Sequence, residues 1–479
     1  MTSCDANASE IIRNIREEYG DSYDAMTWLS PEKAAEASDR RDSLLTDIFK
    51  HQDRGPGWAF AGTKLYTHSL SPGCSLCGNG GWSCLFINGI CNAKCFYCPS
   101  PQADKGQPMT NTLEFKNPND YADYVRVFNI RGVSFSGGEP FMTLDRVLTF
   151  LKTLRAKVSH PLYIWMYTNG LLVTEDKLKT LRDNGLDEIR FDLSANAYRL
   201  DALEKAVGVI PCVTVEIPAI PEDLETTRPL LKTLHDAGVN HLNLHQLRCT
   251  PFNQSRLIQR NYTFLHGPRA TVLETEPAAL ELIRYALDKR IPLPINYCSF
   301  TFRSQFQRAA ALKRNGLLIK AAHEDMTPTG HIRTMSVMGE EQYIRSLHGS
   351  LISKAIDPAL WRTTQSFDQL FFNAALWPHM DFTGVRLKVS YSSTSLRPSV
   401  SFRNPFKEIA LNRKKKVVIE RQTEESGLFF EGSQIHGFGH EFINPELAAP
   451  DSMAGSLPTE LSAKTNRFET FRPGLAPYY

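Results

Sequence analysis

Three cysteines in one short stretch of the chain have the spacing of an iron–sulfur ligand set. Cys91, Cys95 and Cys98 directly follow an apolar run and are separated from one another by three and by two residues. Soft thiolates suit iron–sulfur clusters, and each of the three can hold one iron of a cubane [4Fe–4S] cluster. The fourth iron then has no protein ligand, so the spacing predicts a cluster with one open coordination position. The same spacing could also belong to a zinc site.

A glycine-rich element follows the cysteines along the chain. Ser136, Gly137, Gly138, Glu139 and Pro140 are consecutive and end a second apolar run. Two glycines let the backbone approach a ligand closely, and the adjacent carboxylate can accept hydrogen bonds from an ammonium group. For this motif alone, a plain turn between a strand and a helix is the alternative. Its occurrence downstream of the three cysteines favours the ligand-binding interpretation.

Together the two motifs resemble those of the radical S-adenosylmethionine (SAM) superfamily. In that family the amino and carboxylate groups of SAM chelate the open iron, and an electron from the cluster cleaves SAM to methionine and a 5′-deoxyadenosyl radical. The resemblance implies that the three cysteines hold the cluster and that the Gly-Gly-Glu-Pro element binds the methionyl amine. It also implies an aromatic contact to the adenine and polar contacts to the rest of SAM; the residues concerned are Tyr97, Asn169, Asp192 and Ser194.

Short apolar runs alternate with segments of helical periodicity in the middle of the chain. The six runs are 85–87, 133–135, 162–167, 189–193, 213–217 and 242–244. This alternation predicts βαβ units with a parallel sheet, in which the loops after the strands carry the site. By the resemblance, the fold class is α/β with a partial (β/α)6 radical SAM barrel.

Length and composition allow more than one domain. The chain has 479 residues, of which 42% are apolar, enough to fill a large core. We expect an N-terminal helical cap (1–64), the barrel (65–250), a helical wrap that completes the barrel (251–320) and an α+β extension (321–479). The resemblance covers roughly the second of these segments, and the last carries no motif of known function.

Charge and hydropathy narrow the classes of partner. The net charge is +2, which does not indicate a basic surface for nucleic acid. The first residues are polar, and no run of about 18 uncharged apolar residues occurs. We therefore expect a cytoplasmic protein without a membrane span. The clustering of cysteines at short gaps also fits a reducing compartment.

Further cysteines predict a second metal site, with either an iron–sulfur cluster or zinc. Cys74 and Cys77 form a C-x2-C pair, and Cys84 follows seven residues later. Cys84 opens the first predicted strand whereas Cys91 follows it, so the second site should lie near the opposite end of that strand from the radical cluster. The expected fourth ligand is Cys298, with Cys249 and Cys212 as alternatives. Cys298 fits that end only if the strand before it does not run parallel to the first.

Polar residues late in the barrel are the candidates for contact with substrate. Glu216 lies inside an apolar strand, where a buried carboxylate requires a partner, either substrate or a structural arginine. His245, Gln246 and Arg248 end the sixth strand and could face substrate. Arg303 belongs to a helix whose charges we interpret as a solvated face.

The sequence therefore predicts a radical SAM enzyme that abstracts hydrogen from a small molecule, an amino acid or a peptide side chain. An electron donor such as flavodoxin or ferredoxin is the expected partner. The upstream cysteines resemble those of proteins similar to pyruvate formate-lyase activating enzymes, so a glycyl-radical enzyme activase is the alternative enzyme. A non-catalytic metal-binding or redox-sensing protein is the alternative from another class, since the clustered cysteines alone would suffice for it.

Overall fold

The computed structural model describes residues 3–444 and 457–478. Residues 1–2 of the predicted cap (1–64) and residues 445–456 and 479 of the predicted extension (321–479) lie outside the described residues. The chain divides into two compact units: unit 1 comprises Met1–Gln307, Leu411–Lys415 and Arg472–Tyr479, and unit 2 comprises Arg308–Ala410 and Lys416–Phe471. Among the helices described, none is both long enough and apolar enough to cross a membrane.

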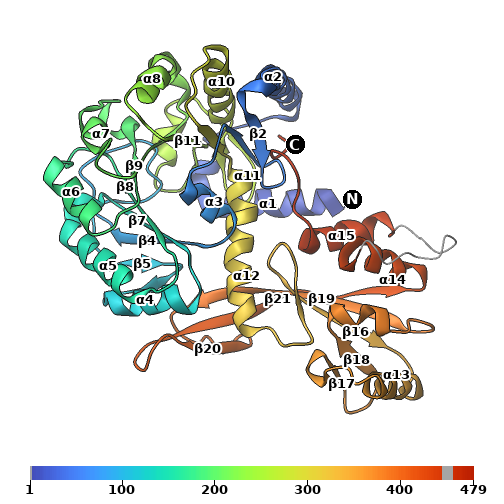
Figure 1. Ribbon diagram of the computed structural model, residues 1–479. Helices are drawn as coiled ribbons and strands as arrows, with labels where there is room; N and C mark the ends of the chain where they lie inside the picture. Colours follow the sequence, from blue (N-terminus) through green and yellow to red (C-terminus); the bar gives the residue numbers. More distant parts are fainter. Residues whose placement is uncertain (1–2, 445–456, 479) are drawn as a thin grey trace. The chain divides into compact units, whose positions relative to one another are not determined.

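Unit 1 is built on an 11-stranded sheet whose central strands run parallel (Figure 1). In spatial order the parallel strands are β4 (Trp82–Asn88), β7 (Gly132–Gly137), β8 (Tyr163–Thr168), β9 (Glu188–Phe191), β10 (Cys212–Pro218), β11 (His241–His245) and β14 (Ile295–Cys298). Antiparallel strands β3 (Lys64–Thr67) and β2 (Pro56–Ala59) extend one edge, and β5 (Met109–Thr110) and β6 (Leu113–Glu114) extend the other. All six predicted strands are present, so the α/β fold is confirmed.

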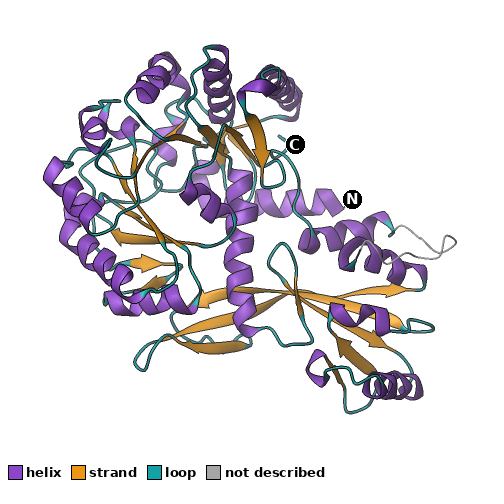
Figure 2. Cartoon of the chain, viewed as in Figure 1, coloured by secondary structure: helices purple, strands orange, loops and turns teal. Residues whose placement is uncertain are grey.

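Helices between the parallel strands lie on the outside of the curved sheet (Figures 1 and 2). They are α4 (Pro118–Val127), α5 (Leu144–Lys157), α6 (Glu175–Asp183), α7 (Asp201–Ala206), α8 (Leu224–Asp236) and α10 (Thr275–Asp288). In α5, for example, Val147, Leu151 and Leu154 recur at helical spacing and are fully buried. One apolar stripe per helix therefore covers the sheet, which leaves the carboxyl ends of the strands free for a site.

The seventh parallel strand, β14, lies within the predicted helical wrap (251–320). It is four residues long and pairs with β11 so that Cys298 stands opposite His245. The strand before Cys298 thus runs parallel to the first strand, and Cys298 lies at the carboxyl end of its strand, like the residues of the site loops. The sequence predicts a strand before Cys298, but a run this short carries no signal for its direction, so the end at which Cys298 lies could not be predicted.

The remaining elements of unit 1 pack around this sheet. They are α1 (Ser3–Tyr19), α2 (Pro31–Phe49), α3 (Pro72–Gly78), α9 (Gln254–Ile258), α11 (Phe300–Phe302) and a small sheet of β1 (Thr27–Trp28), β12 (Thr263–Leu265) and β13 (Thr271–Val272). Helix α3 begins where the Ser71 side chain accepts a hydrogen bond from the Cys74 backbone NH, and Pro72 occupies its first position. It packs against β4, β7 and β8.

Unit 2 is an α+β unit, as predicted for the C-terminal extension. Its antiparallel sheet comprises β15 (Asp325–Met326), β16 (Ile332–Met338), β17 (Trp361–Thr363), β18 (Gln369–Phe372), β19 (Arg386–Arg397), β20 (Phe406–Ala410) and β21 (Lys416–Glu431). Its helices are α12 (Arg308–Ile319), α13 (Glu341–Ser353), α14 (Ser433–Phe438) and α15 (Thr459–Glu469). Alternate residues of β16 and β19 form the core together with one face of α13.

Candidate active site

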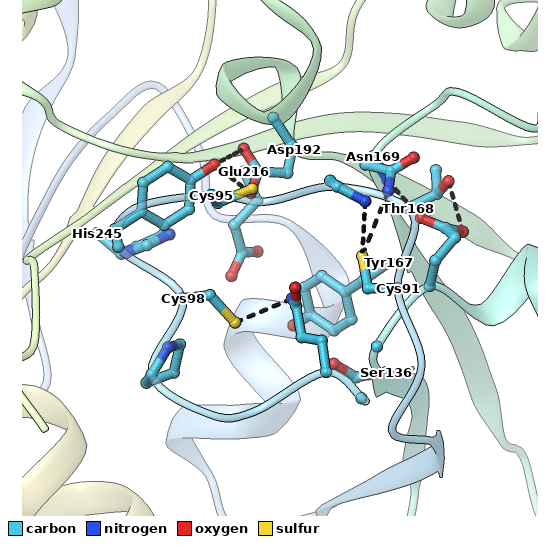
Figure 3. A pocket seen from close by; sticks show the side chains of 18 of the residues that line it. Cys91, Cys95, Cys98, Ser136, Tyr167, Thr168, Asn169, Asp192, Glu216 and His245 are labelled. Atoms are coloured by element: carbon cyan, nitrogen blue, oxygen red, sulfur yellow. Dashed lines mark hydrogen bonds between the residues drawn. The ribbon is translucent and has the colours of Figure 1, made fainter. Parts of the chain in front are cut away.

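A cavity of about 290 Å³ lies at the carboxyl ends of the parallel strands in unit 1 (Figure 3). The three motif cysteines line it together with four polar residues predicted to face substrate. Those four are Glu216, His245, Gln246 and Arg248. Six of the seven residues expected to contact SAM also line it, namely Tyr97, Gly137, Gly138, Glu139, Asn169 and Asp192. Residues from six separate segments of the sequence therefore meet in one place.

The cysteine loop presents its thiols to polar donors. Asn169 Nδ2 donates to Cys91 Sγ at 3.6 Å, and Gln102 Nε2 donates to Cys98 Sγ at 3.0 Å (Figure 3). Burial raises the pKa of Cys95 to about 11, so metal ligation at this thiol must displace a proton. Hydrogen bonds to sulfur stabilise the thiolate and tune the potential of a cluster. The donor set thus fits an iron–sulfur cluster held by three thiolates.

The glycine pair brings the end of β7 against the chain that leads into the cysteine loop. Gly137 has φ +115°, and a Cβ added there would lie 2.1 Å from the carbonyl oxygen of Asn88. At Gly138 the added Cβ would lie 1.9 Å from the carbonyl oxygen of Ile90. The Gly138 NH donates to Asn88 O at 2.9 Å, and the Glu139 NH donates to Ile90 O at 2.7 Å. Only glycine permits this approach, and Ile90 immediately precedes the first cluster cysteine.

Glu139 joins the ends of β7 and β8. Its Oε1 accepts hydrogen bonds from the Phe141 NH and Thr168 Oγ1, both at 3.0 Å, and its Oε2 accepts from the Asn169 NH at 2.8 Å. The side chain is 1% exposed, and burial raises its pKa above the ordinary value. Because Oε2 has one donor in this arrangement, it retains a lone pair that could accept from an ammonium group.

Three of the residues expected to contact SAM bind one another. Tyr97 OH donates to Asp192 Oδ2 at 2.9 Å and lies 2.6 Å from Ser194 Oγ, which donates to Asp192 Oδ1 at 2.5 Å. Burial raises the pKa of Asp192 to about 6. Ser194 is the one expected contact that does not line the cavity; it supports the two that do. This cluster links the cysteine loop to the end of β9.

Glu216 has the structural arginine that was one of its two expected partners. Arg190 Nη1 lies 2.7 Å from Glu216 Oε2, and Asn243 Nδ2 donates to the same oxygen at 3.0 Å. Glu216 nevertheless lines the cavity. Nearby, burial and the charge of Arg303 lower the pKa of His245 to about 4. His245 is therefore neutral at neutral pH and can accept or donate a hydrogen bond.

The interpretation of Arg303 as part of a solvated face is wrong. Arg303 opens a π-helical turn (Arg303–Gln307) that follows β14, and it lines the cavity. Burial, together with the positive charges of Arg269 and Arg303, lowers the pKa of Arg248, whose Nε has no hydrogen-bond partner among the described residues. The end of the cavity lined by Arg248 and Arg303, called the far end below, is thus cationic. The spacing of charges in the sequence gave no signal for this, because the π-helical turn changes which side chains face inward.

Tyr167 and Ser136 also line the cavity and were not singled out from the sequence. Both lie near the carboxyl ends of their strands, a position that itself could have indicated them.

Among the described residues, no group of three or more His, Cys, Asp or Glu side chains has the geometry to hold a single metal ion. Cys84 receives hydrogen bonds from Ser134 and Ser136, and burial raises its pKa to about 11.

Part of the chain is similar to known radical SAM proteins. The family model of the radical SAM superfamily matches residues 85–199. The chain is 27% identical over 273 residues to a Methanocaldococcus jannaschii protein named as a glycyl-radical enzyme activating enzyme, an alignment that spans 54% of this chain and 72% of that protein. It is 26% identical over 215 residues to a Methanosarcina mazei protein named as a GTP 3′,8-cyclase, spanning 43% of this chain and 57% of that protein.

Solved structures show weaker similarity. Coproporphyrinogen III oxidase from Escherichia coli, described as a radical SAM enzyme, aligns with a TM-score of 0.29 at 14% identity over 47% of this chain and 57% of its own. Streptococcus suis SuiB, bound to its precursor peptide, aligns with a TM-score of 0.29 at 14% identity over 43% of this chain and 42% of its own. The alignments thus span 57% and 42% of these two proteins, and similarity at this level identifies no common activity.

Proposed function

We propose that this chain is a radical SAM enzyme whose cofactors are a [4Fe–4S] cluster and SAM, and that it abstracts a hydrogen atom from a substrate bound in the cavity of unit 1. When bound, these cofactors supply a 5′-deoxyadenosyl radical, and the protein's part is to orient the substrate and exclude water. One observation carries the proposal: the motif cysteines and the four residues expected to face substrate line the same cavity.

The chain's own residues take distinct roles in this proposal. Cys91, Cys95 and Cys98 hold the cluster. Glu139 accepts a hydrogen bond from the methionyl amine of SAM through the free lone pair of Oε2. Asp192, which is already bound to the tyrosine hydroxyl of the cysteine loop, turns its carboxylate toward the polar part of SAM. An external donor such as flavodoxin or ferredoxin supplies the electron.

The far end of the cavity suits a substrate with a polar or anionic group. Arg248 and Arg303 both line it, and their guanidinium groups can pair with a carboxylate or donate to a carbonyl oxygen. Neutral His245 and Gln246 add hydrogen-bonding capacity that does not fix the charge of the ligand. An amino acid, a peptide or a small carboxylic acid meets these requirements.

A glycyl-radical enzyme activase is the second candidate. It is favoured by the similarity to the Methanocaldococcus jannaschii protein named as such an enzyme, which extends over 273 residues. In that case the substrate is a glycine in a protein loop, and the cationic end of the cavity holds backbone carbonyl groups of that loop.

The experiment is an anaerobic reconstitution of the full chain with iron and sulfide, followed by dithionite, SAM and an extract from cells grown in deuterated medium. Hydrogen abstraction predicts 5′-deoxyadenosine that carries deuterium, and the Arg248→Met variant should form less of this labelled product. A variant with Cys91, Cys95 and Cys98 all replaced by Ala is the control and should form none. Unlabelled product from the wild type with every extract would contradict abstraction from a substrate, and no product at all would leave only a metal-binding protein.

A further inference from the structure

A second group of thiols lies in unit 1, outside the lining of the cavity. Cys74 and Cys77 come from α3, and Cys298 comes from the end of β14. The ammonium group of Lys64 interacts electrostatically with all three thiols, and it donates a hydrogen bond to the thiol of Cys298. Lys64 is 1% exposed, among the largest fully buried side chains of the protein. Two neighbouring cysteines and a third more than 220 residues later in the sequence thus meet around one buried cation.

Local structure explains why these residues converge. Cys74 and Cys77 are three residues apart on α3 and so project from one face of the helix. β3 pairs with β14 in antiparallel register, which places Lys64 opposite Cys298. Asn296, two residues earlier on β14, has its Nδ2 3.9 Å from Cys74 Sγ. The helix and the strand are therefore held together at the thiols.

The charges around the thiols are unusual for a protein interior. A buried ammonium group normally pairs with a carboxylate, because an isolated buried charge is costly. Lys64 forms no ion pair with a carboxylate in the part of the chain that the structure describes; its Nζ lies 4.1 Å from the centroid of the Phe302 ring, and the polar groups beside it are the three thiols. Arg303, a second cation, hydrogen-bonds Cys298. Buried Lys64 and half-buried Arg303 therefore face the cysteines, and Arg190, which is paired with Glu188 and Glu216, has its Nη1 3.9 Å from Cys74 Sγ. This surplus of cations favours negative charge on the sulfurs.

We propose that Cys74, Cys77 and Cys298 bind a second iron–sulfur cluster beside the substrate end of the cavity. A [4Fe–4S] core in its 2+ state with three thiolates carries one net negative charge, which the ammonium group of Lys64 neutralises. Gln307 Nε2 lies 2.9 Å from Cys77 Sγ and supplies a hydrogen bond to a ligating sulfur. Three thiols converge here, one fewer than a closed structural zinc site requires, whereas three thiolates suffice for the cubane cluster that the same chain binds at its first motif.

Two observations define the position of this second site. Cys84, expected to share it, is not among the thiols that surround Lys64, so we assign no ligand role to it. Arg303 hydrogen-bonds Cys298 and also lines the cavity, so a single side chain separates the second cluster from bound substrate. The site therefore adjoins the substrate end of the cavity.

Iron content and EPR spectroscopy test this proposal on the full chain, reconstituted anaerobically with iron and sulfide. The wild type should bind about eight irons and show two signals after reduction, because each cubane cluster holds about four irons. SAM should change only one of the two signals, because the residues expected to bind SAM line the cavity with Cys91, Cys95 and Cys98, whereas Cys74, Cys77 and Cys298 do not line it. Cys298→Ala and the Cys74→Ala/Cys77→Ala double variant should each bind about four irons and keep the SAM-responsive signal.

Matched controls separate ligation from a general effect of losing a thiol. Cys84→Ala and Cys212→Ala should keep the iron content of the wild type. The variant with Cys91, Cys95 and Cys98 replaced by Ala should retain about four irons, and its signal should not change when SAM is added. This variant detects the second cluster without relying on substitutions at Cys74, Cys77 or Cys298, which could disturb folding. About four irons in the wild type, undiminished iron in Cys298→Ala, loss of iron in Cys84→Ala, or zinc in place of iron would each overturn the proposal. Loss of the SAM-responsive signal alone would instead contradict the proposed function.

Discussion

Replacing Gly138 by alanine tests whether the end of β7 holds the cysteine loop in place. The new Cβ would lie 1.9 Å from the carbonyl oxygen of Ile90 and 2.8 Å from Oδ1 of Asn88. Real Cβ atoms essentially never approach another heavy atom within 3.0 Å, and the closer of these two atoms belongs to the backbone. The Ile90 carbonyl must therefore move by roughly 1 Å, and Cys91, the next residue, must move with it.

We expect this displacement to lower the rate of SAM cleavage more than it lowers stability. A shift of about 1 Å in a positioned group can reduce a rate by about 100-fold. Overpacking of this kind costs about 1–3 kcal/mol of unfolding free energy, which a typical domain with about 5–15 kcal/mol tolerates. The assay is formation of 5′-deoxyadenosine by the reconstituted, dithionite-reduced protein, together with iron content and urea unfolding.

Gly349→Ala is the matched control. Gly349 lies in α13 of unit 2, is exposed, and has no atom within 4 Å of the position of a new Cβ. Alanine favours a helix interior by about 0.8–1.0 kcal/mol over glycine, so this variant should be at least as stable as the wild type and equally active. If Gly138→Ala forms 5′-deoxyadenosine at the wild-type rate with full iron content, the close approach of β7 does not position the loop, and the reasoning is refuted.

Three further substitutions test other parts of the structure. Arg190 is 3% exposed and its Nη1 lies 2.7 Å from Glu216 Oε2, so Arg190→Met should lower the free energy of unfolding, measured in urea, by about 3–5 kcal/mol. The control is Arg228→Met at a partly exposed ion pair, which should lower the free energy of unfolding by less than about 1 kcal/mol. Equal losses in the two variants would contradict this prediction. Asp192→Asn weakens a hydrogen-bonded cluster at the cavity and should raise the KM for SAM about tenfold, whereas an unchanged KM would remove Asp192 from the site. Burial lowers the pKa of His331 to about 4, so the folded state binds a proton less readily than the unfolded state does. The free energy of unfolding should therefore fall as the pH drops from about 6.5 to about 4, and at pH 5 it should be about 2 kcal/mol lower than at neutral pH. His331→Gln should lose that dependence, as measured by urea unfolding at two pH values, and the same slope in the variant would disprove it.

Short-range patterns predicted the fold and which residues line the cavity. The cysteine spacing and the Gly-Gly-Glu-Pro element are properties of a few adjacent residues, and six apolar runs sufficed to place the strands that carry them. Because the carboxyl ends of parallel strands meet at one edge of a sheet, His245 and Gln246 could be expected beside the cysteine loop, and they line the same cavity.

Features that depend on long-range pairing could not be predicted in the same way. The direction of β14 is set by hydrogen bonds to β11, and its four residues contain no signal for it. Glu216 requires a partner, yet only the fold identifies Arg190 on the neighbouring strand as that partner. The spacing of charges assigns Arg303 to a solvated face, whereas the fold places it shortly after β14, where it lines the cavity.

The central claim is that one iron of the cluster at Cys91, Cys95 and Cys98 has no protein ligand. EPR spectroscopy of the reduced full chain with and without SAM tests this claim most directly. Since Cys91, Cys95 and Cys98 supply only three ligands, SAM should bind the fourth iron and change the spectrum of that cluster. The variant in which all three cysteines are alanine should lack the signal that responds. A wild-type spectrum that stays the same when SAM is added would show that every iron already has a protein ligand and would contradict the account.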